Sequence, residues 1–387
     1  MRYYFIYRVL RDVFKHNLEA VIGFKHKLLS DEVHLDAAVK WLTMTIEKSN
    51  HNGSLKAYNF FRGWMRPYPE TSGYIILTLL DLFKHYNNPL YLELAKDIGD
   101  WEISIQREDG GFVGRELGYK DSPIVFNTGQ ILLGLTYLFE MTTEDKYEKA
   151  CKKASDFLIS CMDSNGCFVK YLHSDIVHSY NVRVAWALLK FGLLRSDDKI
   201  VNSALENIEW TLEQQINNGY FENNSFYKDS YANTHTVGYV LRGLLESHLL
   251  TKNQKYLDCV QLATERIILK YGIHRKLGCD IDRKWKNVSK HICLTGYAQL
   301  AIVLLKTYQL NNDLRYLNTA LHLIDDVKSH QVLNARFKDY NGAIPGSFPI
   351  YGRYAPMQLP NWATKFFIDA LLLKMKVLES YENSIND

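Results

Sequence analysis

The sequence predicts an all-α fold, an (α/α)6 barrel in which six helical hairpins close into a ring. Three observations predict it. Along the 387-residue chain, strongly apolar segments recur, glycine-containing turns fall between them, and an amphipathic segment precedes each turn. Repetition of one helix–turn–helix unit at a nearly constant interval is typical of architectures built from copies of that unit.

The apolar segments are predicted to form the inner helices, because they are hydrophobic nearly all round. They align on one recurring position, which is glycine in four units and a cation in two. The six residues at this position are Gly73, Gly129, Arg183, Gly238, Gly296 and Lys365. The intervals between them are 56, 54, 55, 58 and 69 residues, a regularity that indicates six related units.

The segments before the turns are predicted to form the outer helices, because apolar residues at helical spacing share each segment with a charged face. Their expected ranges are 33–49, 90–106, 145–161, 199–215, 254–270 and 313–331. Turns such as Glu108-Asp-Gly-Gly-Phe and Ser164-Asn-Gly-Cys-Phe follow them. Asn-Gly and Asp-Gly supply the positive φ that ends a helix and turns the chain.

A closed ring is favoured over an open solenoid, because a solenoid needs polar terminal caps and the last unit is fully apolar. No linker interrupts the chain, so residues 1–387 are expected to form one toroid domain with an N-terminal helix, 1–29, packed on the barrel. A long loop follows each glycine turn. Loops of this kind in a compact domain are usually functional, and all six should surround the N-termini of the inner helices.

Composition excludes several classes of function. The 46 basic and 43 acidic side chains give a net charge of +3, which is too balanced for a nucleic-acid-binding protein. The six cysteines form no CxxC motif and no secretory segment is evident, so reduced thiols and a cytoplasmic location are expected. No apolar run has the length of a transmembrane helix. Oligomeric state stays open.

Three carboxylates are the candidate acids and bases. Glu70 stands just before an inner helix, behind two prolines that fix its approach, and enclosure there would raise its pKa. Asp121 and Asp282 lie in long loops and are candidates for a second carboxylate of a glycosidase pair. The competing interpretation makes Glu70 a helix N-terminal charge and the two aspartates turn or cap residues.

Three histidines, His178, His235 and His291, precede successive inner helices. His178 and His235 are further catalytic candidates, since histidine can remove a proton beside a sugar carboxylate. Arginines would neutralise that carboxylate, with structural packing as the alternative. The rings expected to stack on a sugar, with the same alternative, are Trp64, Trp285, Tyr351, Tyr354 and Trp362. The expected substrate-binding residues are Trp64, Arg66, Tyr74, Arg115, Asn127, Tyr180, Arg183, Arg283, Trp285, His291, Tyr351, Arg353, Asn361, Trp362 and Lys365.

The repeated Asp/Asn-Gly-aromatic turns and the Gly-Tyr starts of inner helices resemble the α/α-toroid superfamily of six-hairpin glycosidases, uronyl hydrolases, polysaccharide lyases and sugar epimerases. The stretches Gly342-Ala-Ile-Pro-Gly-Ser-Phe-Pro-Ile-Tyr-Gly-Arg-Tyr and Pro360-Asn-Trp-Ala-Thr-Lys-Phe-Phe resemble the last repeat of toroid proteins from bacterial polysaccharide gene clusters. They are more loosely similar to the helical domain of glucuronyl C5-epimerases. The resemblance implies processing of an oligosaccharide or polysaccharide with an acidic sugar, by hydrolysis, β-elimination or epimerisation.

Two alternatives come from other classes. Gln106-Arg-Glu-Asp-Gly-Gly-Phe resembles repeats of isoprenoid cyclases and prenyltransferase β-subunits, which share the toroid. A prenyltransferase or lanthionine cyclase needs a zinc set, and the spacing of Cys279, Asp280 and His291 does not support one, so neither a metal nor another cofactor is expected. A non-catalytic glycan-binding toroid is the other alternative.

Overall fold

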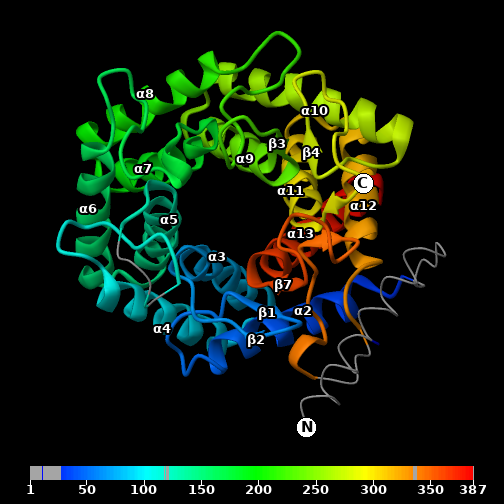
Figure 1. The fold of residues 1–387 in the computed structure, drawn as a ribbon, viewed down its shortest axis with the longest axis horizontal. Helices are drawn as coiled ribbons and strands as arrows, with labels where there is room; N and C mark the ends of the chain where they lie inside the picture. Colours follow the sequence, from blue (N-terminus) through cyan, green and yellow to red (C-terminus); the bar gives the residue numbers. More distant parts are fainter. Residues whose placement is uncertain (1–10, 12–27, 117, 119–121, 334–337, 387) are drawn as a thin grey trace.

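The computed structural model describes residues 11, 28–116, 118, 122–333 and 338–386. Its helices form two concentric layers around a central axis (Figure 1). The inner helices are α3 (Pro69–Tyr86), α5 (Val125–Thr142), α7 (Val182–Arg195), α9 (Thr234–Thr251), α11 (Leu294–Asn311) and α13 (Asn361–Asn386). The outer helices are α2 (Asp31–Glu47), α4 (Pro89–Ile105), α6 (Asp145–Ser160), α8 (Asp198–Glu213), α10 (Gln254–His274) and α12 (Leu314–Lys328).

The ring is closed, as predicted. Each inner helix contacts the next one along the chain, and α13 contacts both α3 and α2 (Figure 1). A small sheet adds to the closure, because β1 (Ala57–Asn59) pairs with β2 (Gly63–Trp64) on one side and with β7 (Gln358–Pro360) on the other. The loop of the first unit is thereby hydrogen-bonded to the loop of the last.

The turns that follow the inner helices differ in backbone conformation from most of the turns that follow the outer helices. Each inner helix from α3 to α11 ends at a residue in the left-handed region, as at Asn87 with φ 49°, and the next outer helix begins almost at once. The other outer helices lead instead toward glycine turns, whereas α10 continues through Gly272 and ends at Arg275, where φ is 48°. At Gly110, φ is +88° and an added Cβ would lie 2.2 Å from the carbonyl oxygen of Lys153, so only glycine fits there.

Close packing of inner helices explains the recurring glycine position. A Cβ on Gly73 would lie 2.6 Å from the Cα of Ile131 in α5, and one on Gly129 would lie 2.6 Å from the side chain of Val184 in α7. The two cations at this position, Arg183 and Lys365, are each 2% exposed. They lie in the interior of the barrel, so the recurring position faces inward in these units.

The long loops also pair with one another. Strand β3 (Ala232–Asn233) pairs with β4 (Asp280–Ile281), and β5 (Ile292–Cys293) pairs with β6 (Ser347–Phe348). Two short 3-10 helices, η1 (His173–Asp175) and η2 (Ser179–Asn181), lie in the loop before α7, and a third, η3 (Lys338–Tyr340), lies in the loop before α13. The loops before α9, α11 and α13 therefore form one connected layer above the inner helices.

Three further expectations from the sequence can be compared with the described residues. The N-terminal helix expected over 1–29 falls almost entirely outside the described residues. The six cysteines are free thiols. Among the helices of the described ranges, none is long and apolar enough to cross a membrane.

Candidate active site

Side chains from the N-terminal ends of the inner helices meet at the centre of the loop end. We call this group the central cluster, and each of its members contacts or electrostatically influences another. It contains Tyr68, Glu70, Tyr74, Asn127, Tyr180, Arg183, His235, Tyr239, Tyr354, Trp362 and Phe366. The cluster combines one carboxyl group, one guanidinium and one imidazole with a wall of aromatic rings.

Glu70 is the carboxyl group of the cluster. It lies in the first turn of α3, directly after Pro69 at the start of that helix. Its Oε2 accepts a 2.7 Å hydrogen bond from Tyr68 Oη, and Asn127 Nδ2 donates to the same Tyr68 oxygen at 3.3 Å. Burial raises the pKa of Glu70 to about 7, although the Tyr68 hydrogen bond and the positive charges of Lys56 and Arg183 act to lower it. A carboxyl group with this pKa can give or take a proton near neutral pH.

Arg183 is the guanidinium of the cluster and lies in the first turn of α7. Its Nε donates to Gln130 Oε1 at 2.5 Å. Three rings surround its Cζ, with centroids 5.3 Å away at Trp186, 5.2 Å at Tyr239 and 5.6 Å at Phe366. The contacts hold a permanent positive charge inside the barrel, where it influences the pKa of Glu70.

His235 is the imidazole of the cluster and is 4% exposed. Its Nδ1 accepts a hydrogen bond from the side-chain amide of Gln299, which leaves the proton on Nε2. Its ring lies 4.3 Å from that of Tyr239 and 5.2 Å from that of Tyr354. Burial, with the charge of Arg183, lowers the pKa of His235 to about 3, so the ring is neutral at physiological pH. A neutral ring of this kind is a hydrogen-bond donor and a weak base.

His178 lies beside the cluster rather than within it. Its Nε2 donates to the carbonyl oxygen of His173 at 2.8 Å, and its ring stacks on Tyr180 with a centroid distance of 4.3 Å. Burial lowers the pKa of His178 to about 4. Both its proton and its ring face are therefore engaged by neighbours, which is the pattern of a packed structural histidine.

Two other inward-facing candidates are held in internal contacts. Lys365 forms an ion pair with Asp369, and its Nζ lies 5.4 Å from the Tyr74 ring and 4.5 Å from the Phe366 ring. Asn361 is buried, and its Nδ2 donates to the hydroxyl oxygens of Ser54 at 2.8 Å and Thr71 at 2.9 Å. The contacts of Asn361 join the start of α13 to α3.

Several predicted site residues lie elsewhere and pack or pair locally. Asp282 Oδ1 accepts the backbone N–H groups of Lys284 and Lys286, which makes it a turn residue. Arg283 forms an ion pair with Glu222.

Trp285 and Trp64, two of the rings expected to stack on a sugar, contact other residues of the protein. The Trp285 indole N–H donates to the carbonyl oxygen of Asn218. The Trp64 ring stacks on Trp41 with a centroid distance of 5.7 Å.

The remaining candidates are at the surface or outside the described chain. Arg66, Arg115, Tyr351 and Arg353 are exposed. Asp121 lies outside the described residues, so the pairing expected between it and Glu70 stays a prediction.

Sequence reasoning missed three members of the central cluster: Tyr68, Tyr239 and Phe366. A signal for Tyr239 existed, because it follows the recurring glycine at the same place as Tyr74. Tyr68 stands two residues before Glu70 in the proline-containing segment already singled out. Tyr354, one of the rings expected to stack on a sugar, does reach the cluster, and its Oη accepts the Trp362 indole N–H at 2.8 Å.

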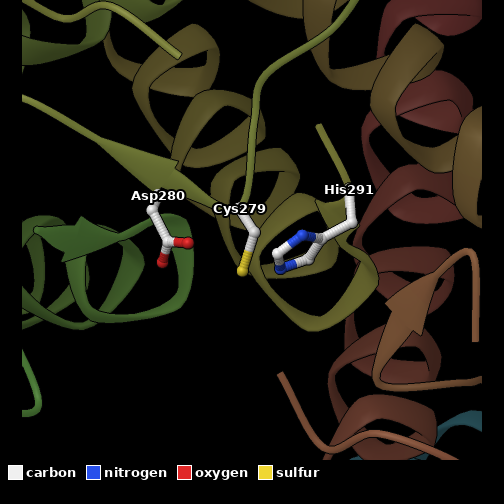
Figure 2. Close-up of side chains that lie close together, drawn as sticks. All are labelled: Cys279, Asp280 and His291. Atoms are coloured by element: carbon white, nitrogen blue, oxygen red, sulfur yellow. The ribbon is translucent and has the colours of Figure 1, made fainter. Parts of the chain in front are cut away.

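A second group of polar side chains lies in the loop between α10 and α11. Figure 2 shows Cys279 between Asp280 and His291, with the nitrogen-bearing edge of the imidazole turned toward the sulfur. One potential ligand atom from each of the three residues lies within 4.8 Å of the others. Their spacing along the chain did not predict this meeting, which depends on how the loop folds.

Comparison with known proteins identifies the fold. No family model and no curated protein matches the sequence. Among solved structures, an unsaturated glucuronyl hydrolase specific for heparin matches with a TM-score of 0.71 and 14% identity, over 90% of this chain and 98% of that one. A D-mannose isomerase matches with a TM-score of 0.69 and 12% identity, over 89% and 97%.

A cellobiose 2-epimerase from Bacillus thermoamylovorans also has a TM-score of 0.69 and 12% identity, over 88% of this chain and 97% of that one. The agreement spans nearly the full length of each of these chains. The predicted six-hairpin, glycosidase-like (α/α)6 toroid is therefore confirmed as the fold of this protein.

Proposed function

We propose that this protein is a carbohydrate-active enzyme that hydrolyses an oligosaccharide containing an acidic sugar, with Glu70 as the proton donor. The observation that carries the proposal is the setting of Glu70. It is the carboxyl group of the central cluster, its pKa is raised to about 7 by burial, and Tyr68 holds its orientation. The toroid structures that this chain resembles include hydrolases of unsaturated glucuronyl groups, which supports an acidic sugar as substrate.

An anionic substrate favours the donor role. A uronate carboxylate placed near Glu70 would disfavour a second negative charge, and so raise the pKa of Glu70 further and keep it protonated. Among the described residues, Tyr68, Lys56 and Arg183 act to lower its pKa. Asp121, the second carboxylate expected from the sequence, lies outside the described residues.

The rest of the cluster suits a sugar. Tyr354 and Trp362 are joined by a hydrogen bond and form an aromatic wall next to His235. Aromatic faces bind the apolar faces of sugar rings, and the His235 Nε2–H is a donor for a sugar hydroxyl or carboxylate. The exposed Arg66, Arg115 and Arg353 belong to the long loops and are proposed to bind the charged groups of a longer oligosaccharide.

Isomerisation or epimerisation of a sugar is the second candidate. The observation that favours it is that His235, a member of the central cluster that is neutral at physiological pH, lies in the first turn of inner helix α9. A neutral imidazole can accept a proton from a sugar carbon. The matches to a mannose isomerase and a cellobiose epimerase support the same class.

The first experiment is a turnover screen on uronic-acid oligosaccharides with saturated and unsaturated ends, run in deuterated water. New reducing ends with loss of unsaturated uronide indicate hydrolysis, whereas a gain of unsaturated uronide indicates β-elimination. Deuterium at a sugar carbon without chain cleavage indicates isomerisation or epimerisation. Glycan binding with no turnover would contradict an enzymatic role, and silence on all glycans would favour the isoprenoid class.

Glu70→Gln tests the residue assignment in the same screen. It should lower turnover about a hundredfold, because proton transfer from a positioned side chain contributes at least that much. Glu102→Gln is the matched control, since Glu102 is a fully buried carboxyl group on outer helix α4 whose pKa burial also raises. Equal turnover in wild type and Glu70→Gln would overturn the donor role.

A further inference from the structure

The loop between α10 and α11 folds back on itself and brings Cys279 beside His291. The backbone N–H of Cys279 donates to the carbonyl oxygen of His291 at 2.8 Å, which sets the two residues opposite each other. Asp280, the next residue, lies in β4 and pairs with Asn233 of β3. The backbone of two paired loops therefore fixes where all three side chains begin.

The three side chains present different ligand atoms to one small space. Figure 2 shows the Cys279 sulfur between the Asp280 carboxylate and the His291 ring. The atoms lie within 4.8 Å of one another, Cys279 is 1% exposed, and Asp280 and His291 are partly buried. His291 Nε2 is buried and has no hydrogen-bond partner. A buried polar nitrogen without a partner is costly unless a ligand binds it.

Asn233 holds two of the three groups in place. Its Nδ2 donates to Cys279 Sγ at 2.9 Å and to Asp280 Oδ1 at 3.2 Å. This is the arrangement of an outer-shell residue, which orients ligands while leaving their other lone pairs available. The side-chain oxygen of Asn233 also accepts the backbone N–H of His235, so this loop site is linked to the central cluster.

We propose that Cys279, Asp280 and His291 bind a zinc ion through the thiolate, the carboxylate and Nε2. Sulfur, imidazole and carboxylate ligands together match the preferences of Zn²⁺. The two anionic ligands balance the charge of the ion. The zinc proposal is independent of the proposed hydrolase activity, because its test measures metal binding and not turnover.

The neighbouring Cys293 is not part of the group whose ligand atoms all lie within 4.8 Å of one another. It lies at the N-cap of α11, where its sulfur accepts the backbone N–H of Gly296 at 3.3 Å. Three protein ligands leave one tetrahedral position for water or a substrate group, as in catalytic zinc sites. Because Asn233 joins the site to the start of α9, the fourth position belongs to the same end of the barrel as His235.

The test is titration of the metal-stripped full chain with Co²⁺, followed by competition with Zn²⁺. We expect one equivalent to bind, with the sulfur-to-cobalt charge-transfer absorption and the strong visible bands of tetrahedral cobalt, and Zn²⁺ to abolish both. Metal analysis after growth with added zinc should find one zinc per chain. Wild-type protein that binds no stoichiometric metal, or whose cobalt spectrum lacks the thiolate band, overturns the proposal.

Variants assign the ligands. Cys279→Ala and His291→Ala should lose the tetrahedral spectrum, while Cys293→Ser, which removes the adjacent thiol, should retain it. Asn233→Ala should weaken zinc binding about 10- to 100-fold, as loss of an outer-shell partner does. Circular dichroism checks that each variant is folded. If His291→Ala is not folded, His291→Gln is used in its place. Cys279→Ala that binds metal as wild type does, or Cys293→Ser that does not, overturns the assignment.

Discussion

Tyr68 donates a 2.7 Å hydrogen bond to Glu70, its neighbour two residues along the chain. The bond crosses the start of α3, because Tyr68 is the N-cap residue and Glu70 lies in the first turn. It opposes the effect of burial on Glu70, since a donor stabilises the ionised carboxylate and burial destabilises it. The pKa of about 7 is the balance between burial and the opposing effects of this bond and of the charges of Lys56 and Arg183.

Tyr68→Phe should raise the pKa of Glu70. Loss of the donor removes support for the carboxylate, so the pKa of Glu70 should rise by about one unit, the equivalent of one hydrogen bond to a charged group. If Glu70 is the proton donor, the alkaline limb of the kcat/KM profile moves to higher pH. Measuring that profile for wild type and variant checks the shift.

Tyr271→Phe is the control for Tyr68→Phe. Tyr271 also donates a 2.7 Å hydrogen bond to a carboxylate, that of Asp326, but it lies on outer helix α10. Loss of the Tyr271 hydrogen bond should leave the alkaline limb of the kcat/KM profile at the same pH. A profile that moves equally in both variants, or in neither, would contradict the assignment of the alkaline limb to Glu70.

Glu70→Gln should change the dependence of stability on pH. The pKa of Glu70 is raised in the folded chain from 4.5 to about 7, so the folded state holds this proton more tightly than the unfolded state. The wild type therefore loses stability as pH rises through this window, from about 4.5 to about 7, and Gln cannot ionise. The Tm of the variant relative to wild type should increase across the window and stay level above it. Parallel Tm curves from pH 4 to pH 8 would show that burial does not destabilise the carboxylate.

The helices could be predicted closely because their signals are local. The outer helix expected at 90–106 is α4 at Pro89–Ile105, and the one expected at 145–161 is α6 at Asp145–Ser160. Apolar spacing and glycine turns are properties of neighbouring residues, and neither needs knowledge of the tertiary fold. Glu70 could be singled out for the same reason, since its position is fixed by the start of one helix.

The rest of the site depends on contacts between distant segments. Tyr354 lies beside His235 only because β5 and β6 pair the last two long loops. The meeting of Cys279 with His291 likewise depends on a backbone hydrogen bond within a long loop. Loop conformation has no periodic signal in a sequence, so the composition of these clusters was not predictable from spacing.

Gly73→Ala should destabilise the barrel by about 1–3 kcal/mol, the usual cost of adding a methyl group to a tightly packed interface. The new Cβ would lie 2.6 Å from the Ile131 Cα, so α3 and α5 must separate. Gly272→Ala is the control, because nothing lies within 4 Å of a Cβ there. It should stabilise α10 by up to about 1 kcal/mol, the difference in helix propensity between alanine and glycine. Urea unfolding of both variants tests this, and a Gly73→Ala chain as stable as wild type would contradict the close packing.

Arg183 has two roles that two substitutions separate. Its charge lowers the pKa of Glu70, and its guanidinium contacts three rings and Gln130. Arg183→Lys keeps the charge but loses the planar contacts, so it should destabilise the fold by about 1–3 kcal/mol and leave the alkaline limb of kcat/KM nearly in place. Arg183→Met removes the charge as well, so that limb should move to higher pH. Urea unfolding and pH profiles of both variants decide the matter. If Arg183→Lys and Arg183→Met shift the alkaline limb of the kcat/KM profile equally, the charge of Arg183 does not act on the ionising group. The role of Arg183 is then packing alone.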